Sequence, residues 1–296
     1  MKIIDLFAGC GGMSLGFQNE KFEIIEAHDN WEIAVNCYSV NFQHPVYKTD
    51  LGDYQKVVPM LMEKSADLII GGPPCQEFSI AGKRKEGARA DLTAIFGSIV
   101  ASVKPKYFVM ENVAPCAKSI AYGEARKSLL DAGYGLTEIV LNAALCGVPQ
   151  RRKRFFVVGG IGQQMNFLDE IVHTNLAKKE MTLHDYFGDD LNFEYYYSHP
   201  RNYNRRGIFS IHEPSSTIRG VNRPIPMGYT GHPADPTKKF KELRPLTTRE
   251  RSEVQTFPPG FIFPNSKTQS EQLIGNAVPV NQARFVAKCL RQHLEA

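Results

Sequence analysis

Residues Lys2-Ile3-Ile4-Asp5-Leu6-Phe7 are followed directly by Ala8-Gly9-Cys10-Gly11-Gly12. The first six form a short, mostly apolar run that predicts a β-strand. The glycines predict a turn in which the backbone can approach a ligand, and we expect a helix to begin near Met13. This order of strand, glycine turn and helix is the first unit of an α/β fold.

The glycine turn does not match the common nucleotide fingerprints. A dinucleotide fingerprint requires glycine where Ser14 stands, and the chain has no Gly-Lys-Ser/Thr to hold phosphates as a P-loop does. Both nucleotide interpretations are therefore weakened. The turn by itself is compatible with a ligand site or with a tight connection.

The alternation of strands and helices continues over the first 160 residues. It predicts a doubly wound, largely parallel sheet covered on both faces. We expect further strands at 22–27, 46–51, 66–70, 106–110, 135–141 and 155–159, and helices at 32–41, 92–103, 124–132 and 281–293.

Length and composition bound the class of protein. At 296 residues and 43% hydrophobic, the chain can bury a full core and is long enough for two domains. Asp5 stands where a secretory signal would be apolar, and no apolar run approaches the ~18 residues of a membrane helix. The six cysteines include no Cys-x-x-Cys pair. We therefore expect a cytosolic protein with reduced thiols, no disulfide framework and no metal.

Charge is unevenly distributed along the chain. Residues 191–271 carry twelve Lys and Arg against seven Asp and Glu, a surplus of five, so the remainder is at −1 in a chain of net charge +4. Aromatic and basic residues alternate there on sequence without helical periodicity, from Tyr195 to Arg223. This pattern favours a nucleic-acid interface, although a solvated surface would have a similar composition. We expect 191–271 to form a second domain, and 1–190 plus 272–296 to form the first.

Acidic residues follow three of the expected strands. Asp29 follows the second strand, Asp50 lies at the end of the third, and Glu111 follows strand 106–110. In a doubly wound fold, ligands bind outside the carboxyl ends of the strands, so Asp29 suits ribose hydroxyls and Asp50 an adenine amino group. Either aspartate could instead cap a helix.

The stretch 71–79, Gly-Gly-Pro-Pro-Cys-Gln-Glu-Phe-Ser, leaves the strand at 66–70 through two prolines. Pro73 and Pro74 fix the backbone and so aim Cys75, which suits a nucleophile, whereas an isolated free cysteine is usually a small buried hydrophobe. A thiol with a pKa near ~8.5 needs help to ionise at neutral pH. Candidates are the backbone amides of the following turn and the cations Lys83, Arg84, Lys85 and Arg89, on a loop that we expect to be mobile.

A basic run, Arg151 to Arg154, precedes the strand at 155–159. The amino end of a strand is an unusual place for direct chemistry in such a fold. We therefore expect this run to support a loop or to contact phosphate.

Six ordered motifs now identify a family resemblance. They are Phe7-Ala-Gly-Cys-Gly-Gly12, Pro73-Pro-Cys-Gln76, Glu111-Asn-Val113, Gln150-x-Arg152-x-Arg154, Arg244-Pro-Leu-Thr-x-x-Glu250 and Gly275-Asn-Ala-Val-Pro279. The chain resembles the DNA cytosine-5 methyltransferases over almost its whole length. It departs from the family at Asp29, where glutamate is more frequent, and at Val280, where a second proline is usual.

The resemblance implies a fold, a cofactor and a substrate. The fold is the Rossmann-like sheet of S-adenosylmethionine-dependent methyltransferases, built from both chain ends, with a smaller, irregular, β-rich target-recognition domain. Phe7 would contact the adenine, Asp29 the ribose, and Asp50 with Leu51 the adenine edge. The full set of implied cofactor residues is Phe7, Ala8, Gly9, Gly11, Gly12, Asp29, Asn30, Asp50, Leu51, Pro73, Asn276, Ala277 and Val278.

The resemblance also implies a mechanism. Cys75 attacks carbon 6 of a cytosine flipped out of double-stranded DNA, and Glu111 bonds the ring N3 and the exocyclic amine. Arg152 would steady this site, with Arg154 in support. The DNA contacts implied are Gln76, Ser79, Lys83, Arg84, Lys85, Arg89, Arg205, Arg206, Thr217, Arg219 and Arg223. By analogy we expect a monomer in a bacterial or archaeal cytosol that works beside a restriction endonuclease without a stable complex.

The sequence also bears on three alternative functions. A zinc deaminase is excluded because Phe78 occupies its second cysteine position and His293-x-Glu295 lies at the wrong end of the chain. The tRNA-methylating branch of the same family carries a Cys-Phe-Thr signature that the sequence lacks. A catalytically inactive DNA-binding relative is disfavoured because Cys75, Glu111 and Arg152 are all present.

Overall fold

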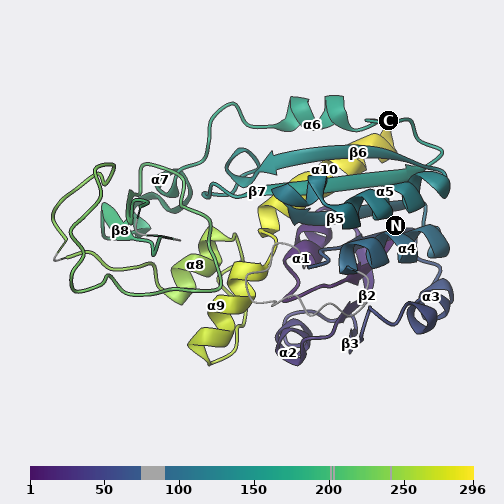
Figure 1. Ribbon diagram of the computed structural model, residues 1–296, viewed down its shortest axis with the longest axis horizontal. Coiled ribbons are helices and arrows are strands. Elements are labelled where there is room, and N and C mark those ends of the chain that lie inside the picture. The colour runs from purple at the N-terminus through teal and green to yellow at the C-terminus, as the bar shows by residue number, and fades with distance from the viewer. Residues whose placement is uncertain (75–90, 201, 203, 241) are drawn as a thin grey trace.

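The computed structural model describes residues 1–74, 91–200, 202, 204–240 and 242–296. Within these ranges, seven strands form one sheet in the order β3-β2-β1-β4-β5-β7-β6 (Figure 1). The strands are β1 (Lys2–Leu6), β2 (Glu23–Asp29), β3 (Val46–Lys48), β4 (Leu68–Gly71), β5 (Tyr107–Val113), β6 (Tyr134–Asn142) and β7 (Lys153–Ile161).

The sheet is mostly parallel, as the alternation predicted, and one strand departs from this. β1 pairs in parallel with β2 and β4, and β4 pairs in parallel with β5. β7, however, runs antiparallel to both of its neighbours, β5 and β6. The amino end of β7 therefore lies at the edge of the sheet where β1, β4 and β5 end.

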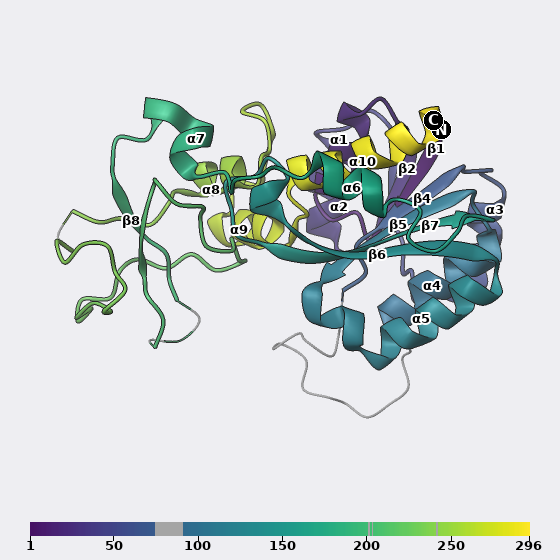
Figure 2. The same ribbon diagram turned by 90° about the horizontal axis from the view of Figure 1, so that it is seen from above.

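Helices cover both faces of the sheet (Figure 2). Alternate residues of β1 enter different cores: Ile3 packs with α1 and α10, whereas Ile4 packs with α3, α4 and α5. This is the period-two pattern of a strand buried on both sides. The helices of this part are α1 (Gly12–Asn19), α2 (Glu32–Ser39), α3 (Tyr54–Met62), α4 (Leu92–Val103), α5 (Ile120–Asp131), α6 (Asp169–Asn175) and α10 (Val280–Glu295).

The segment after the sheet forms a second, smaller region beside it (Figure 1). It holds a two-stranded antiparallel sheet of β8 (Tyr195–Tyr197) and β9 (Ile208–Ser210). Three helices accompany these strands: α7 (Leu183–Phe187), α8 (Thr248–Val254) and α9 (Lys267–Asn276). Its apolar cluster joins Leu183, Tyr196, Ile218, Val254 and Ile274, so the helices that flank the segment share its core.

The two ends of the chain pack together. α10 lies against α1, where Gly16 allows close approach because a Cβ there would lie 2.6 Å from Val280 O. Arg284 and Arg291 of α10 both pair with Glu20, which follows α1, at 2.8 and 2.7 Å. Among the described residues no helix is long and apolar enough to cross a membrane.

Candidate active site

Three connections meet at one edge of the sheet. Because β1, β4 and β5 are parallel, the turn at 7–11, the turn from residue 72 and the segment that follows Glu111 leave the sheet on the same side. The strand order also reverses between β1 and β4, since the chain moves outward to β2 and β3 on one side and to β5 on the other. Such a switch point is where doubly wound sheets bind ligands.

The glycine turn is fixed to the second strand by Asp29. The Gly9 amide donates to Asp29 Oδ2 and the Trp31 amide donates to Asp29 Oδ1, both at 2.8 Å. Burial raises the pKa of Asp29, and these backbone hydrogen bonds oppose the rise. Each carboxylate oxygen keeps further acceptor capacity, so Asp29 both braces the turn and can accept a ribose hydroxyl.

The turn requires glycine at two adjoining positions. Gly11 has φ +91°, and a Cβ there would overlap the rings of Tyr38 and Phe42. At Gly12 a Cβ would lie 2.2 Å from Val278 O. The turn is therefore in direct backbone contact with the Asn276-Ala277-Val278 stretch, 264 or more residues later in the sequence.

The space above the turn fits an adenosyl ligand. At Gly9, with φ +56°, a Cβ would meet nothing within 4 Å, so this backbone borders open space. The second and third strand ends lie together, because the Thr49 amide donates to Asp29 O at 3.0 Å. Asp50 is exposed and its Oδ1 accepts the Gly52 amide at 3.0 Å, while Leu51 is buried. The two acids that the sequence predicted as cofactor contacts, Asp29 and Asp50, thus lie at neighbouring strand ends.

Glu111 and Arg154 form the charged centre of this edge. The Arg154 Nε donates to Glu111 Oε1 at 3.0 Å, and the Glu111 residue is only 8% exposed. Burial raises the pKa of Glu111, whereas Arg154 and, less strongly, Arg152 lower it. A Cβ on Gly72 would lie 3.5 Å from Glu111 Oε2, so the turn after β4 passes beside this carboxylate.

The turn after β4 is tied to the same centre. Asn112 Nδ2 donates to Pro73 O at 3.0 Å and lies 3.3 Å from Thr93 Oγ1 at the start of α4. Pro73 is buried and Pro74 is exposed. Residue 74 is the last described residue before residue 91, and the turn up to this point is held close to Glu111. The other predicted residues of this stretch lie outside the described residues: Cys75, Gln76, Ser79, Lys83, Arg84, Lys85 and Arg89.

The family follows from the comparison of the whole chain with known proteins. A family model for C-5 cytosine-specific DNA methylases matches residues 1–292. The chain belongs to this family. It is 53% identical over 292 residues to the type II methyltransferase M.HindV of Haemophilus influenzae, covering 98% of this chain and 96% of that one. It is 52% identical over 295 residues to M.HgiDI of Herpetosiphon aurantiacus, covering 99% and 95%.

Solved structures share the fold. The methyltransferase EhMeth of Entamoeba histolytica superposes with a TM-score of 0.72 at 22% identity, covering 100% of this chain and 99% of that one. The S. pombe Dnmt2 methyltransferase gives a TM-score of 0.71 at 19% identity, covering 100% and 98%. The predicted methyltransferase sheet, with a smaller antiparallel sheet beside it, is confirmed.

In this methylase the two arginines of the basic run, which we predicted to support the site, have different contacts. Arg154 makes the ion pair with Glu111, whereas the Arg152 guanidinium donates to Ile218 O at 2.8 Å and to Gly275 O and Ala277 O at 3.0 Å. We expected the basic run to be remote from the reaction, because the amino end of a parallel strand lies opposite the ligand-binding edge of the sheet. This reason is wrong, because β7 is antiparallel and its amino end lies beside the carboxyl end of β5. The sequence pattern of a buried strand does not reveal its direction.

The Arg152 side chain is buried where the start of β7 meets Ile218 and the stretch from Gly275 to Ala277, and we call this contact the buried junction. Arg152 is 2% exposed, and burial lowers its pKa well below the usual value. Two glutamines that the sequence analysis did not place in the site complete the junction. Gln150 accepts the Ile218 amide at 2.8 Å and donates to Gln255 at 2.7 Å, and Gln255 donates in turn to Ile274 O and Ala277 O. Only the motif spacing of Gln150 pointed to it; Gln255 carried no sequence signal.

Residues 191–271, which we call the recognition segment, enclose with Arg154 of β7 a cavity of about 710 Å³, which we call the recognition cavity. Four arginines and two histidines line it with Phe209 and several small polar groups. The lining residues are Arg154, Ser198, His199, Pro200, Asn204, Arg205, Arg206, Phe209, Ser216, Thr217, Arg219 and His232. Of the predicted DNA contacts, Arg205, Arg206, Thr217 and Arg219 line this cavity, and Arg223 is exposed outside it.

Two of these arginines already have protein partners. Arg206 forms an ion pair with Glu213 and stacks over Phe209, with its guanidinium carbon 4.3 Å from the ring centroid. Arg219 donates to His199 O. His199 also contacts Tyr197, at 3.2 Å from its hydroxyl, and was not among the predicted contacts. Arg206 and Arg219 are thus held in fixed positions in the cavity wall.

Proposed function

We propose that this methylase transfers a methyl group from S-adenosylmethionine to carbon 5 of a flipped-out cytosine in a short double-stranded DNA sequence. The observation that carries the proposal is the buried Glu111–Arg154 pair beside the turn that leads to Cys75. An acid and a cation at this position can hold the polar edge of one cytosine while a nucleophile on the neighbouring turn attacks the ring.

In the proposed reaction, the Cys75 thiolate forms a bond to carbon 6 of cytosine. The displaced electron pair makes carbon 5 nucleophilic, and Glu111 in its protonated form donates to N3 as charge develops there. S-adenosylmethionine supplies an electrophilic methyl group, which carbon 5 takes, leaving S-adenosylhomocysteine. Solvent then takes the proton on carbon 5, the electron pair of that C–H bond re-forms the carbon 5–carbon 6 double bond and expels the Cys75 thiolate, and Glu111 takes its proton back from N3. The raised pKa of Glu111 favours the protonated donor.

The proposed cofactor contacts follow from the geometry of the turn. Asp29 would accept from the ribose, Asp50 and Leu51 would meet the adenine edge, and Phe7 would face the ring. Asn30, Pro73 and the Asn276-Ala277-Val278 stretch would complete the site. We assign 1–190 and 272–296 to the catalytic domain and 191–271 to target recognition, with the buried junction of Arg152 between them.

We propose further that the methylase protects DNA as part of a type II restriction-modification system, acting as a monomer in a bacterial or archaeal cytosol. The support is similarity to M.HindV and M.HgiDI, both type II methyltransferases of bacteria. The cognate endonuclease would share the site without binding the methylase stably.

The proposal is tested in a host that lacks cytosine-5 methylation. Bisulfite sequencing of DNA from cells that express the protein should show conversion-resistant cytosines within one short sequence. Cys75→Ala should abolish this signal and retain S-adenosylmethionine binding by calorimetry. The control Cys116→Ala alters a buried cysteine far from the turn in sequence and should still methylate. Methylation by Cys75→Ala would overturn the nucleophile assignment, and resistant cytosines on RNA alone would overturn the substrate.

A further inference from the structure

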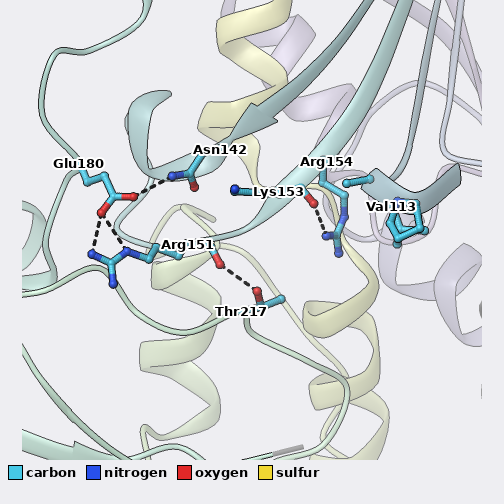
Figure 3. A pocket seen from close by; sticks show the side chains of 9 residues that line it. Val113, Asn142, Arg151, Lys153, Arg154, Glu180 and Thr217 are labelled. Atoms are coloured by element: carbon cyan, nitrogen blue, oxygen red, sulfur yellow. Dashed lines mark hydrogen bonds and ion pairs between the residues drawn. The ribbon is translucent and has the colours of Figure 1, made fainter. Parts of the chain in front are cut away.

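A cavity of about 540 Å³ opens beside Arg154, the arginine that pairs with Glu111. Figure 3 shows the residues that line it. We call it the flanking cavity. Its walls come from the segment after β5, the end of β6, the start of β7 and the recognition segment. The lining residues are Val113, Ala114, Pro115, Asn142, Arg151, Lys153, Arg154, Glu180 and Thr217. Arg154 and Thr217 also line the recognition cavity, so the two cavities are neighbours on either side of these residues.

Two of the three cations in the flanking cavity are neutralised by protein carboxylates. Arg151 pairs with Glu180 at 2.7 Å, and Asn142 Nδ2 donates to the same carboxylate at 2.8 Å (Figure 3). The Arg151 hydrogen bond lowers the pKa of Glu180, so this acid is charged. Arg154 pairs with Glu111 at 3.0 Å. While Glu111 is ionised, these two cations therefore contribute little net attraction for a further anion.

Lys153 is the remaining cation. Its side chain is exposed, and it forms no ion pair with any residue that the structure describes. Its backbone is fixed, because Lys153 lies opposite Asn142 in the β6–β7 ladder and next to Arg154, which lies opposite Val113. Its charge also lowers the pKa of Glu180, so Lys153 lies within electrostatic range of that carboxylate without forming a close ion pair with it. The flanking cavity thus has three cations, Arg151, Lys153 and Arg154, against the carboxylates of Glu180 and Glu111, and Lys153 is the cation whose ammonium is not held by a carboxylate that the structure describes.

The position of Lys153 matches the course of a DNA strand. A base and its two phosphates are joined through one sugar, so a cytosine bound at Glu111 brings its own backbone close to Arg154. The Thr217 hydroxyl already donates to Arg151 O at 2.8 Å, so the ammonium of Lys153 is the group left to hold a single monoanionic phosphodiester, whereas Glu180 disfavours additional negative charge.

We propose that Lys153 binds a backbone phosphate of the target strand, next to the flipped cytosine, in the flanking cavity. The inference rests on the proposed function and adds a residue that positions the substrate strand. Phosphate contacts fix the register of a protein on DNA without reading sequence. Lys153 would thereby help to hold the extruded nucleotide over Glu111.

The first test measures salt dependence. The duplex carries the sequence found by bisulfite sequencing, and its affinity for the full chain with S-adenosylhomocysteine is followed by fluorescence anisotropy from 50 to 200 mM KCl. One lost phosphate contact makes the slope of log affinity against log salt shallower by about 0.9, which is about fivefold in affinity near 0.15 M salt. We expect this of Lys153→Gln and no change for Lys127→Gln, an exposed lysine on α5. Equal slopes for both variants would overturn the inference.

The second test locates the phosphate. Each phosphate of the target strand in turn is replaced by a neutral methylphosphonate. At one position adjacent to the target cytosine, the replacement should weaken binding by wild type and leave Lys153→Gln unaffected. If every replacement weakens both proteins equally, Lys153 binds no phosphate of this strand.

The outcomes separate this inference from the proposed function. A wild-type protein that neither methylates DNA nor binds it in a salt-dependent manner refutes the proposed function. A wild-type protein that does both, with a Lys153→Gln variant that shows no altered slope and no coupled phosphate, refutes only the role of Lys153.

Discussion

At the residue scale, the chemistry of this methylase depends on how one buried acid is balanced. Glu111 is almost inaccessible, and its burial raises its pKa because the charged form loses solvation. Arg154 opposes that rise through a 3.0 Å ion pair. In the proposed mechanism the raised pKa favours the protonated form that donates to N3, while the ion pair with Arg154 fixes the orientation of the carboxyl group.

Replacing Arg154 should change the pH dependence of catalysis. Arg154→Gln removes the cation that lowers the pKa of Glu111, so that pKa rises. Because the active form is protonated Glu111, the alkaline limb of the rate should move to higher pH. The measurement is the rate of covalent adduct formation on a duplex with 5-fluorocytosine at the target position, from pH 6 to 9.

Two further variants serve as a test and a control for this prediction. Glu111→Gln should lower the adduct rate by about a hundredfold or more and remove the alkaline limb that Glu111 produces. Arg126→Gln breaks an ion pair with Glu138 at a different place in the fold and should leave the profile unchanged. An alkaline limb of Arg154→Gln that stays in place, or moves to lower pH, contradicts the role given to Glu111.

At the scale of helices and strands, the sequence predicted the presence of a strand better than the direction in which that strand runs. The apolar run at 155–159 was placed correctly within β7, yet the pattern of a buried strand is the same whether it runs parallel or antiparallel. That direction brings Arg154 to Glu111, so the key ion pair could be expected only from the family resemblance. The helix α8 was missed, although Thr247 and Glu250 form a capping box at its start.

Helices α8 and α9 are joined by a buried ion pair that also holds the recognition segment. Arg251 Nε lies 2.5 Å from Glu271 Oε2, with side chains 7% and 4% exposed. Arg251 donates to Arg219 O, and Glu271 accepts from Asn222 Nδ2 at 3.1 Å. The pair thus connects two helices to the loop that lines the recognition cavity.

Replacing one residue of this ion pair should lower the free energy of unfolding more than replacing both residues. Glu271→Met leaves the Arg251 cation buried without a partner and should destabilise by about 3–5 kcal/mol. The double variant Arg251→Met with Glu271→Met should cost less than the two single variants together, because neither charge remains. The free energy of unfolding of each variant is measured by guanidinium denaturation. Arg249→Gln, at a more exposed pair, should change stability by no more than ~0.5 kcal/mol. Additive single and double effects would show that the two residues do not interact.

At the scale of the whole molecule, the catalytic core is built from both chain ends around an inserted segment. α10 places Phe285, Val286 and Leu290 in the same cluster as Ile3 of β1 and Phe156 of β7. The segment before it supplies Val278 against Gly12. The sequence showed that the last helix was apolar enough to return to the core, but which face of the sheet it covers required the structure.

A chain that ends at residue 279 should therefore fail to form the first domain. Phe285, Val286 and Leu290 each contribute about 1.5–3 kcal/mol on burial, a sum comparable with the net stability of about 5–15 kcal/mol of most domains. Gly16 of α1 would also lose its close contact with Val280 O. We expect no cooperative thermal transition by circular dichroism and no S-adenosylmethionine binding by calorimetry. Removal of residues 294–296, which are exposed, is the control and should alter neither. If the shortened chain melts within about 2 °C of the full protein, α10 is dispensable and residues 280–296 do not belong to the catalytic domain.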